Sequence, residues 1–263
     1  MLPSSISKSG DRFGSADESF NLVEPWTAQF VLPDTTMRTH TLAGAITRPP
    51  VFSVRAGQIG TGCLVGKRVL LTAAHCVLDR AAALLHAPLA GNLLHRAPLP
   101  LNINIPGQTG IVATCFVHDE FLRSGRGDLA LCVLSQDINV TPAVVNVSRT
   151  LVTSGQSLTL FGTGETTPAG ARPVRDLSAQ IVGRTPSDLV TASLTRPGDD
   201  IDSGDSGGPA LAKQNGGQFV IGAIVREVAA TGEALIEDLG GSVGQRLLTL
   251  WRQQGRPPLS FAP

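Results

Sequence analysis

The 263-residue chain lacks the marks of several protein classes. It has no Tyr, two Met and two Trp, and no apolar run approaches the ~20 residues of a membrane-spanning helix. Lys and Arg together number 21, as do Asp and Glu, so the net charge creates no field that attracts a polyanion. We therefore expect no nucleic-acid partner and no membrane partner.

The chain also shows no secretion signal and no metal motif. Its first ten residues contain no apolar core of signal-peptide length. We expect a cytoplasmic protein, and export by a route that leaves no mark in the sequence is the alternative. The four cysteines form no Cys-x-x-Cys pair and have no zinc-like spacing to a histidine. We expect no metal and no cofactor.

The composition that is present favours an all-β protein. With 42% hydrophobic residues, 29 Gly and 18 Pro, the chain can bury a sizeable core in many short elements joined by turns. Short apolar runs between turn residues predict strands; they are 49–54, 60–66, 68–72, 111–117, 129–134, 143–147, 157–161, 179–182 and 219–225. Near the C-terminus, Val243, Leu247, Leu250 and Trp251 share one helical face. Residues 1–36 are polar and Ser-rich, which indicates an N-terminal extension.

A glycine-rich stretch at Gly204-Asp205-Ser206-Gly207-Gly208-Pro209 is the main candidate for chemistry. Its glycines permit a tight exposed turn. Such a turn can present the Ser206 hydroxyl to a substrate and bring bare backbone N–H groups to a carbonyl oxygen. An ordinary surface loop is the alternative, so the rest of the chain must supply a base and an orienting carboxylate.

Two residues at strand ends can supply them. His75 follows a predicted buried strand and two alanines, whose small side chains leave space for substrate at the ring. Asp128 precedes the apolar run 129–134, where a carboxylate can fix an imidazole in one tautomer and stabilise its charged form. The alternatives are a structural histidine and a turn aspartate that caps backbone N–H groups.

The order of these residues discriminates between two hydrolase folds. Gly204-x-Ser206-x-Gly208 also matches the nucleophile elbow of α/β-hydrolases, in which the catalytic histidine follows the serine. No histidine follows Ser206, because the last one is His118. The remaining order of His75, Asp128 and Ser206 is that of chymotrypsin. With the motifs 72–76, 128–131 and 204–209, the chain resembles the trypsin-like, chymotrypsin-fold serine proteases.

This resemblance implies two six-stranded antiparallel β-barrels followed by a helix. The protease domain would span 37–263, with barrel 1 at about 37–140, barrel 2 at about 141–240 and the helix at about 242–254. The resemblance implies that His75, Asp128 and Ser206 form a catalytic triad in the cleft between the barrels. The N–H groups of Gly204 and Ser206 would stabilise the oxyanion.

The implied activity is that of a serine endopeptidase, which hydrolyses protein or peptide substrates through an acyl-enzyme. A catalytically silent binding or scaffold module with the same fold is the alternative. Activation is a separate question. In this family a freed N-terminus pairs with the aspartate at the position of Asp205, but the chain has no Ile-Val-Gly-Gly segment at the expected mature start. Either another group pairs with Asp205, or cleavage or an activating protein is needed.

The cysteines also depart from the family. Cys63 and Cys76 match the family's disulfide beside the catalytic histidine, so the resemblance implies a disulfide between them. Cys115 and Cys132 match no family bridge, and we expect them to be buried core thiols. In a reducing cytoplasm all four would be thiols.

Substrate preference is predicted from the residues around the serine. Asp200, six residues before Ser206, resembles the pocket-floor aspartate of proteases that cut after Arg or Lys. A solvated acidic loop is the alternative. Val225-Arg226-Glu227 replaces the usual Ser-Trp-Gly wall of the pocket, and there Arg226 would neutralise part of the negative charge. Asp200, Arg226 and Glu227 are the predicted pocket residues, and cleavage after Arg or Lys is the predicted preference.

Overall fold

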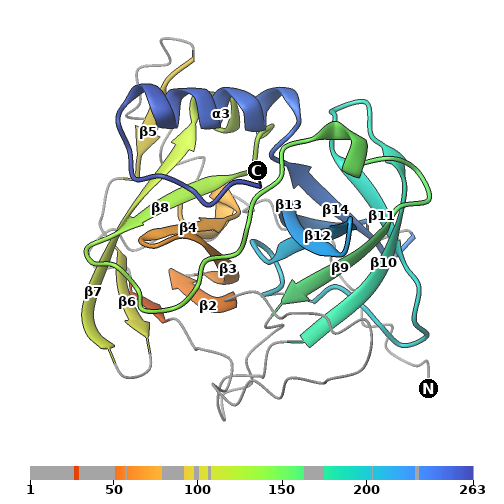
Figure 1. The fold of residues 1–263 in the computed structure, drawn as a ribbon, viewed down its shortest axis with the longest axis horizontal. Coiled ribbons are helices and arrows are strands. Elements are labelled where there is room, and N and C mark those ends of the chain that lie inside the picture. Colours follow the sequence, from red (N-terminus) through yellow and green to blue (C-terminus); the bar gives the residue numbers. More distant parts are fainter. Residues whose placement is uncertain are drawn as a thin grey trace, which may run out of the picture.

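The protein consists of two β-structures that lie side by side, with a C-terminal helix packed across one end (Figure 1). The structure is a computed structural model. It describes the following residues: 27–29, 51–56, 58–78, 92–97, 101–105, 108–162, 175–202, 204–228 and 231–262. Apart from 27–29, the predicted N-terminal extension lies outside the described residues.

The first β-structure is an eight-stranded sheet with the order β1-β6-β7-β8-β4-β3-β2, and β5 pairs with β7. Its strands are β1 (Thr27–Gln29), β2 (Val51–Ala56), β3 (Gln58–Gly66), β4 (Val69–Thr72), β5 (Leu94–Arg96), β6 (Leu101–Ile105), β7 (Gln108–His118) and β8 (Ala130–Leu134). All pairings are antiparallel except that of β1 with β6. The end strands β1 and β2 approach each other, but no ladder among the described residues closes the sheet. The expected first barrel is therefore observed as an open sheet.

The second β-structure is the predicted closed six-stranded antiparallel barrel, with the order β10-β11-β14-β13-β12-β9. Its strands are β9 (Ser157–Gly162), β10 (Arg175–Arg184), β11 (Val190–Leu194), β12 (Pro209–Gln214), β13 (Gly217–Val228) and β14 (Glu233–Asp238). Along β10 the buried residues Leu177, Ala179 and Ile181 alternate with more exposed ones. This period of two directs every second side chain into the barrel. The strand predicted at 143–147 is absent, because only Val145 forms isolated bridges there.

The helices are short except at the C-terminus. They are the 3-10 turns η1 (Ala74–Cys76) and η2 (Arg149–Leu151), and the α-helices α2 (Asp119–Ser124) and α3 (Ser242–Gln253). The predicted C-terminal helix is thus present as α3. Its Trp251 is buried, its indole N–H donates to the carbonyl of Pro257 at 2.8 Å, and its ring meets that of Phe116 edge-on at 5.9 Å. These contacts attach the helix to the first sheet.

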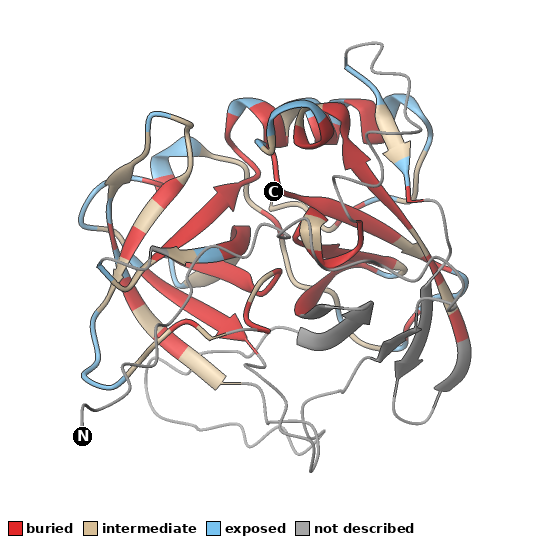
Figure 2. Ribbon diagram, turned by 180° about the vertical axis from the view of Figure 1, so that it is seen from behind, coloured by how far each residue is buried: buried red, intermediate tan, exposed pale blue. Residues whose placement is uncertain are grey.

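Three clusters of buried side chains form the core, and two of them contain residues of both β-structures. In the first, Val225 and Leu235 of the barrel pack with residues of the first sheet. The second also includes the C-terminal helix: it contains Val65, Leu71 and Leu131 from the first sheet, Phe161 and Leu211 from the barrel, and Leu247 and Trp251 from α3. The inward-facing parts of both β-structures are correspondingly buried in Figure 2. Because this apolar contact removes surface of both halves from water, it holds the loops at their junction in a defined arrangement.

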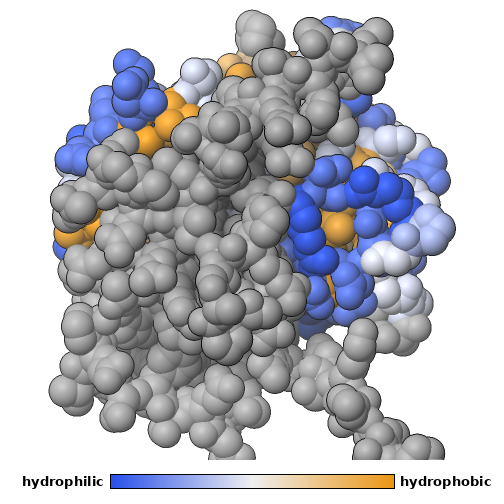
Figure 3. Space-filling model, turned by 90° about the horizontal axis from the view of Figure 1, so that it is seen from below, coloured by the Kyte–Doolittle hydropathy of each residue, from blue (hydrophilic) through white to orange (hydrophobic). Residues whose placement is uncertain are grey.

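The lengths of the described helices and the polarity of the lower face bear on contact with a membrane. Within the described ranges, no helix has both the length and the apolar character needed to cross a bilayer. Figure 3 shows that the described residues on the barrel side of the lower face are mainly hydrophilic, with a few apolar atoms between them.

Candidate active site

His75 and Asp128 are brought together by the pairing of two neighbouring strands. β4 leads into η1, which carries His75, and Thr72 at the end of β4 pairs with Ala130 at the start of β8. Asp128, two residues before Ala130, therefore lies beside His75. The backbone N–H of His75 donates to Oδ1 of Asp128 at 2.9 Å, and Nδ1 of His75 donates to Oδ2 at 2.7 Å. This double contact fixes the imidazole and leaves Nε2 as the proton acceptor.

The carboxylate also changes the basicity of the ring. Asp128 is buried, and the side chain of His75 is 20% exposed. Burial of His75 by itself would lower its pKa, but the negative charge and hydrogen bond of Asp128 raise the pKa well above its usual value. The geometry and the charge therefore suit a base whose protonated form is stabilised.

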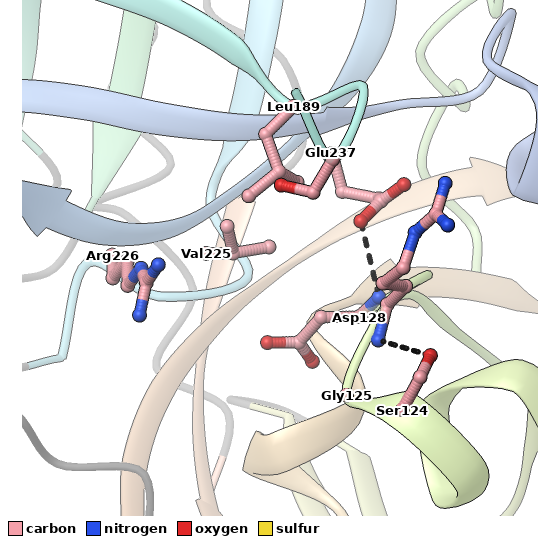
Figure 4. A pocket seen from close by; sticks show the side chains of 9 residues that line it. Ser124, Gly125, Asp128, Leu189, Val225, Arg226 and Glu237 are labelled. Atoms are coloured by element: carbon pink, nitrogen blue, oxygen red, sulfur yellow. Dashed lines mark hydrogen bonds between the residues drawn. The ribbon is translucent and has the colours of Figure 1, made fainter. Parts of the chain in front are cut away.

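A second buried carboxyl, Glu237 on β14, lies behind this pair. Its Oε2 accepts hydrogen bonds from the backbone N–H groups of Gly127 at 3.1 Å and Asp128 at 3.3 Å. Figure 4 shows the second of these bonds. Burial and the nearby Asp128 charge raise the pKa of Glu237 to about 8. Glu237 was not predicted from the sequence. Its signal was a charged residue at the end of the apolar run 234–236.

Ser206 lies in the turn that precedes β12, and close packing requires its glycines. A Cβ on Gly207, which has a φ of 85°, would overlap the carbonyl oxygen of Thr61, and a Cβ on Gly208 would overlap that of Phe161. The N–H of Gly207 donates to the carbonyl of Ile224 at 2.7 Å. The turn is therefore built into both the first sheet and the barrel.

The hydroxyl of Ser206 donates to the carbonyl of Val225 at 3.3 Å. Among the described residues there is no hydrogen bond between Ser206 and His75, and Nε2 of His75 lies 3.6 Å from Sγ of Cys76. The structure thus contains the His75–Asp128 pair. Ser206 lies near it, because Sγ of Cys76, the residue after His75, is 3.5 Å from the carbonyl oxygen of Ser206.

Thr61 holds the predicted oxyanion loop from the side of the first sheet. Its hydroxyl donates to the carbonyl of Gly204 at 2.6 Å, and its N–H donates to the carbonyl of Ser206 at 2.7 Å. Both carbonyls are therefore turned toward Thr61, and the described hydrogen bonds leave the N–H of Ser206 without an acceptor. Thr61 was missed because no local pattern marks a threonine that contacts residues more than 140 positions away.

Asp205 has a partner within the chain. Its side chain is fully buried and forms an ion pair with Arg175, the first residue of β10. Oδ2 of Asp205 also accepts the N–H of Asp202 at 2.9 Å. Of the alternatives for Asp205, the structure therefore contains the first, a pairing group other than a freed N-terminus. Sequence reasoning missed Arg175 because the segment that precedes it carries no motif.

The predicted pocket residues Asp200 and Arg226 have different surroundings in the structure. Asp200 accepts a hydrogen bond from Arg175 at 3.1 Å and is 47% exposed. Arg226 lines a pocket of about 290 Å³ together with Asp128 and Glu237 (Figure 4), and Glu227 is not among its lining residues. Within the described ranges, no three His, Cys, Asp or Glu residues are placed to hold a metal ion.

Comparison with known families agrees with the fold. The family model described as Trypsin matches residues 44–234. The chain belongs to the trypsin family. Among solved structures it is similar to a Glu endopeptidase in complex with MPD, with a TM-score of 0.55 and 17% identity over 75% of this chain and 87% of the other. It also matches a structure of HBP, with a TM-score of 0.48 and 15% identity over 77% and 88% of the two chains. No curated protein matches the chain.

The cysteine predictions based on the trypsin family were wrong. Cys63 and Cys76 are free and buried, because they point to different sides of the first sheet: Cys63 packs with Val65, whereas Cys76 packs with Leu64. The residue that faces Cys76 is Gly60, where a Cβ would lie 2.6 Å from its Sγ.

Cys115 and Cys132, which we expected to be core thiols, form a disulfide. They are direct cross-strand partners on β7 and β8, so the ladder itself brings their side chains together. The sequence spacing of 17 residues gave no hint of this pairing.

Burial raises the pKa of the Cys63 thiol, which remains protonated.

Proposed function

We propose that this member of the trypsin family is a serine endopeptidase that hydrolyses protein or peptide substrates through an acyl-enzyme. The observation that carries the proposal is the His75–Asp128 pair, in which Nδ1 is 2.7 Å from a buried carboxylate. That arrangement orients Nε2 as a base, and the serine-bearing turn from the other β-structure lies against the same η1 turn.

The reaction proceeds in two halves. Oγ of Ser206 attacks the scissile carbonyl while Nε2 of His75 takes its proton, and Asp128 stabilises the imidazolium. The N–H groups of Gly204 and Ser206 stabilise the oxyanion. The tetrahedral intermediate then expels the amine, which receives the proton from His75, and an acyl-Ser206 ester remains. Water, deprotonated by His75, attacks the ester to give a second tetrahedral intermediate. This intermediate expels Oγ of Ser206, which takes the proton from His75, and the acid is released.

A fluorophosphonate probe tests this function. We expect covalent labelling of the full chain, loss of labelling in Ser206→Ala, and unchanged labelling in Ser193→Ala, a matched serine whose hydroxyl bonds to Glu233 on the barrel wall. Persistent labelling of Ser206→Ala would contradict the assignment of the nucleophile. If neither the intact nor the proteolysed chain is labelled, the proposal that the protein is an active serine endopeptidase is contradicted.

One observation favours the second candidate, a catalytically silent binding module. The Ser206 hydroxyl donates to Val225 instead of to His75, and catalysis requires it to rotate about χ1 toward Nε2. Apo structures of active enzymes commonly have such loose contacts, so we prefer the enzyme. Tight substrate binding without labelling or turnover would favour the silent module.

The proposed preference is cleavage after Arg or Lys. It is supported by Asp200, whose position six residues before Ser206 resembles that of the pocket-floor aspartate and whose side chain is partly exposed. An accessible carboxylate there can form an ion pair with a cationic side chain of the substrate. A peptide library in which the residue before the cut is varied tests the preference; selection of apolar or acidic residues would refute it.

A further inference from the structure

The residue before the proposed nucleophile carries a fully buried carboxylate. Asp205 has a side-chain exposure of 0%, and burying a carboxylate without a partner is costly enough that such charges are almost always paired. Arg175 provides this pairing through Nη2. The same guanidinium reaches Asp200 at 3.1 Å and Asp202 at 3.4 Å. It therefore connects three points of the loop that leads to Ser206.

The barrel wall is shaped to receive this carboxylate. Arg175 on β10 pairs directly with Gly162 on β9. A Cβ on Gly162 would overlap Oδ1 of Asp205, so the carboxylate occupies the space that a side chain at this position would fill. In this cross-strand pair, Gly162 thus leaves space for the Asp205 carboxylate and Arg175 provides the positive charge that pairs with it.

Asp205 in turn fixes the backbone on both sides of itself. Its carboxylate accepts the N–H of Asp202 at 2.9 Å, and its carbonyl accepts the N–H of Gly208 at 2.9 Å. Its own N–H donates to the carbonyl of Asp202 at 3.1 Å. Because Ser206 lies inside this set of bonds, the direction of its N–H depends on the position of the Asp205 side chain.

We propose that Arg175 is a positioning residue that holds Asp205 inside the barrel wall and so keeps the Gly204–Ser206 backbone in its catalytic conformation without a freed N-terminus or an activating protein. This inference rests on the proposed endopeptidase function. Arg175 acts through Asp205 and touches no reacting atom. Its guanidinium suits the role because a planar fork can contact several carboxylates at once, which an ammonium group cannot do in the same geometry.

Substitution of Arg175 tests the proposal. In Arg175→Gln we expect the rate of fluorophosphonate labelling and kcat to fall about 100-fold or more, as when an oxyanion donor is lost, with a much smaller change in KM. Hydrogen exchange in peptides that cover 200–208 should become faster. Arg175→Lys keeps the charge, and it should fold and lie between the wild type and Arg175→Gln in both measurements.

A second ion pair provides a matched control. Arg184, 25% exposed, pairs with the buried Asp238 at 2.6 Å, much as Arg175, 28% exposed, pairs with Asp205. Arg184→Gln should lower Tm but leave the labelling rate within about threefold. Equal losses of labelling in both variants, or unchanged labelling and exchange in Arg175→Gln, would overturn the proposal. If Arg175→Gln does not fold, the same comparison is made with Arg175→Lys.

The intact chain separates this inference from the proposed function. We expect full-length protein, with its uncut mass verified by mass spectrometry, to be labelled without proteolysis. Labelling that appears only after limited proteolysis or addition of another protein would overturn the role of Arg175 while supporting the protease. If no preparation is labelled, the proposed function fails, and the exchange rates of 200–208 in Arg175→Gln still decide whether Arg175 orders the loop.

Discussion

Asp205 and Glu237 are two buried carboxyls placed one on each side of the candidate active site, and their partners differ. Asp205, beside Ser206, is paired with the guanidinium of Arg175. Glu237, behind Asp128, accepts two backbone N–H groups, and none of the described residues forms an ion pair with it. Burial and the neighbouring Asp128 charge raise the pKa of Glu237 to about 8.

The difference shows that burial alone does not determine the charge of a carboxyl group. A nearby cation stabilises the ionised form, whereas two backbone donors do not compensate for burial beside another negative charge. The nucleophile side of the site is therefore held by an ion pair. The base side is held by Glu237, whose raised pKa favours the neutral form of its carboxyl.

The largest expected effect comes from removing the negative charge of Asp128. Asp128→Asn should lower kcat/KM by roughly 10⁴, because the imidazole loses its orientation and the stabilisation of its charged form. In the wild type, the raised pKa of His75 means that activity is lost, as pH falls, already above the usual histidine value of 6.5. In Asp128→Asn this acid limb should move to lower pH.

The pH profile of kcat/KM for both proteins checks this prediction. Asp137→Asn, at an exposed position, serves as the matched control and should leave rate and profile unchanged. An acid limb that stays in place in Asp128→Asn would show that another group sets it and would contradict the assignment of Asp128.

The base side of the site was largely predictable from sequence, and the ion pair was not. His75 and Asp128 each adjoin a strong apolar strand, and adjacent antiparallel strands bring such ends together. Arg175 reaches Asp205 only through the pairing of β9 with β10, and this register is not visible in the separate segments. The prediction of a Cys63–Cys76 disulfide failed for the same reason. The family resemblance identified Cys63 but not the face of β3 on which its side chain lies.

The next largest effect concerns Glu237 and stability. Its pKa is about 8 in the folded chain and 4.5 in the reference state, so between these pH values the folded state retains a proton that the unfolded state loses. The free energy of unfolding therefore falls as pH rises through this window. Glu237→Gln keeps an acceptor for the two N–H groups and does not titrate. As pH rises from 4.5 to 8, the free energy of unfolding of Glu237→Gln should therefore increase relative to that of wild type by up to roughly 4–5 kcal/mol.

Denaturant unfolding of both proteins at pH 5 and pH 9 measures this difference. Glu233→Gln on the same strand, at a partly exposed position, should differ from wild type by the same amount at both pH values. Parallel stability curves for wild type and Glu237→Gln would show that Glu237 is ionised throughout, and the contrast with Asp205 would then be lost.

The smallest expected effect concerns Thr61, which joins the two sides of the site. Its buried hydroxyl donates to the carbonyl of Gly204 at 2.6 Å, so Thr61→Val keeps the volume and leaves that carbonyl without this donor. A lost hydrogen bond of this kind costs about 1 kcal/mol, which corresponds to a roughly fivefold lower labelling rate if the bond holds the oxyanion loop.

Thr61→Ser should retain the wild-type rate. Thr72→Val removes another buried hydroxyl, which bonds to the carbonyl of Thr61, and should affect mainly stability. Equal rates in Thr61→Val and wild type would mean that the Thr61 hydroxyl does not help to order the oxyanion loop.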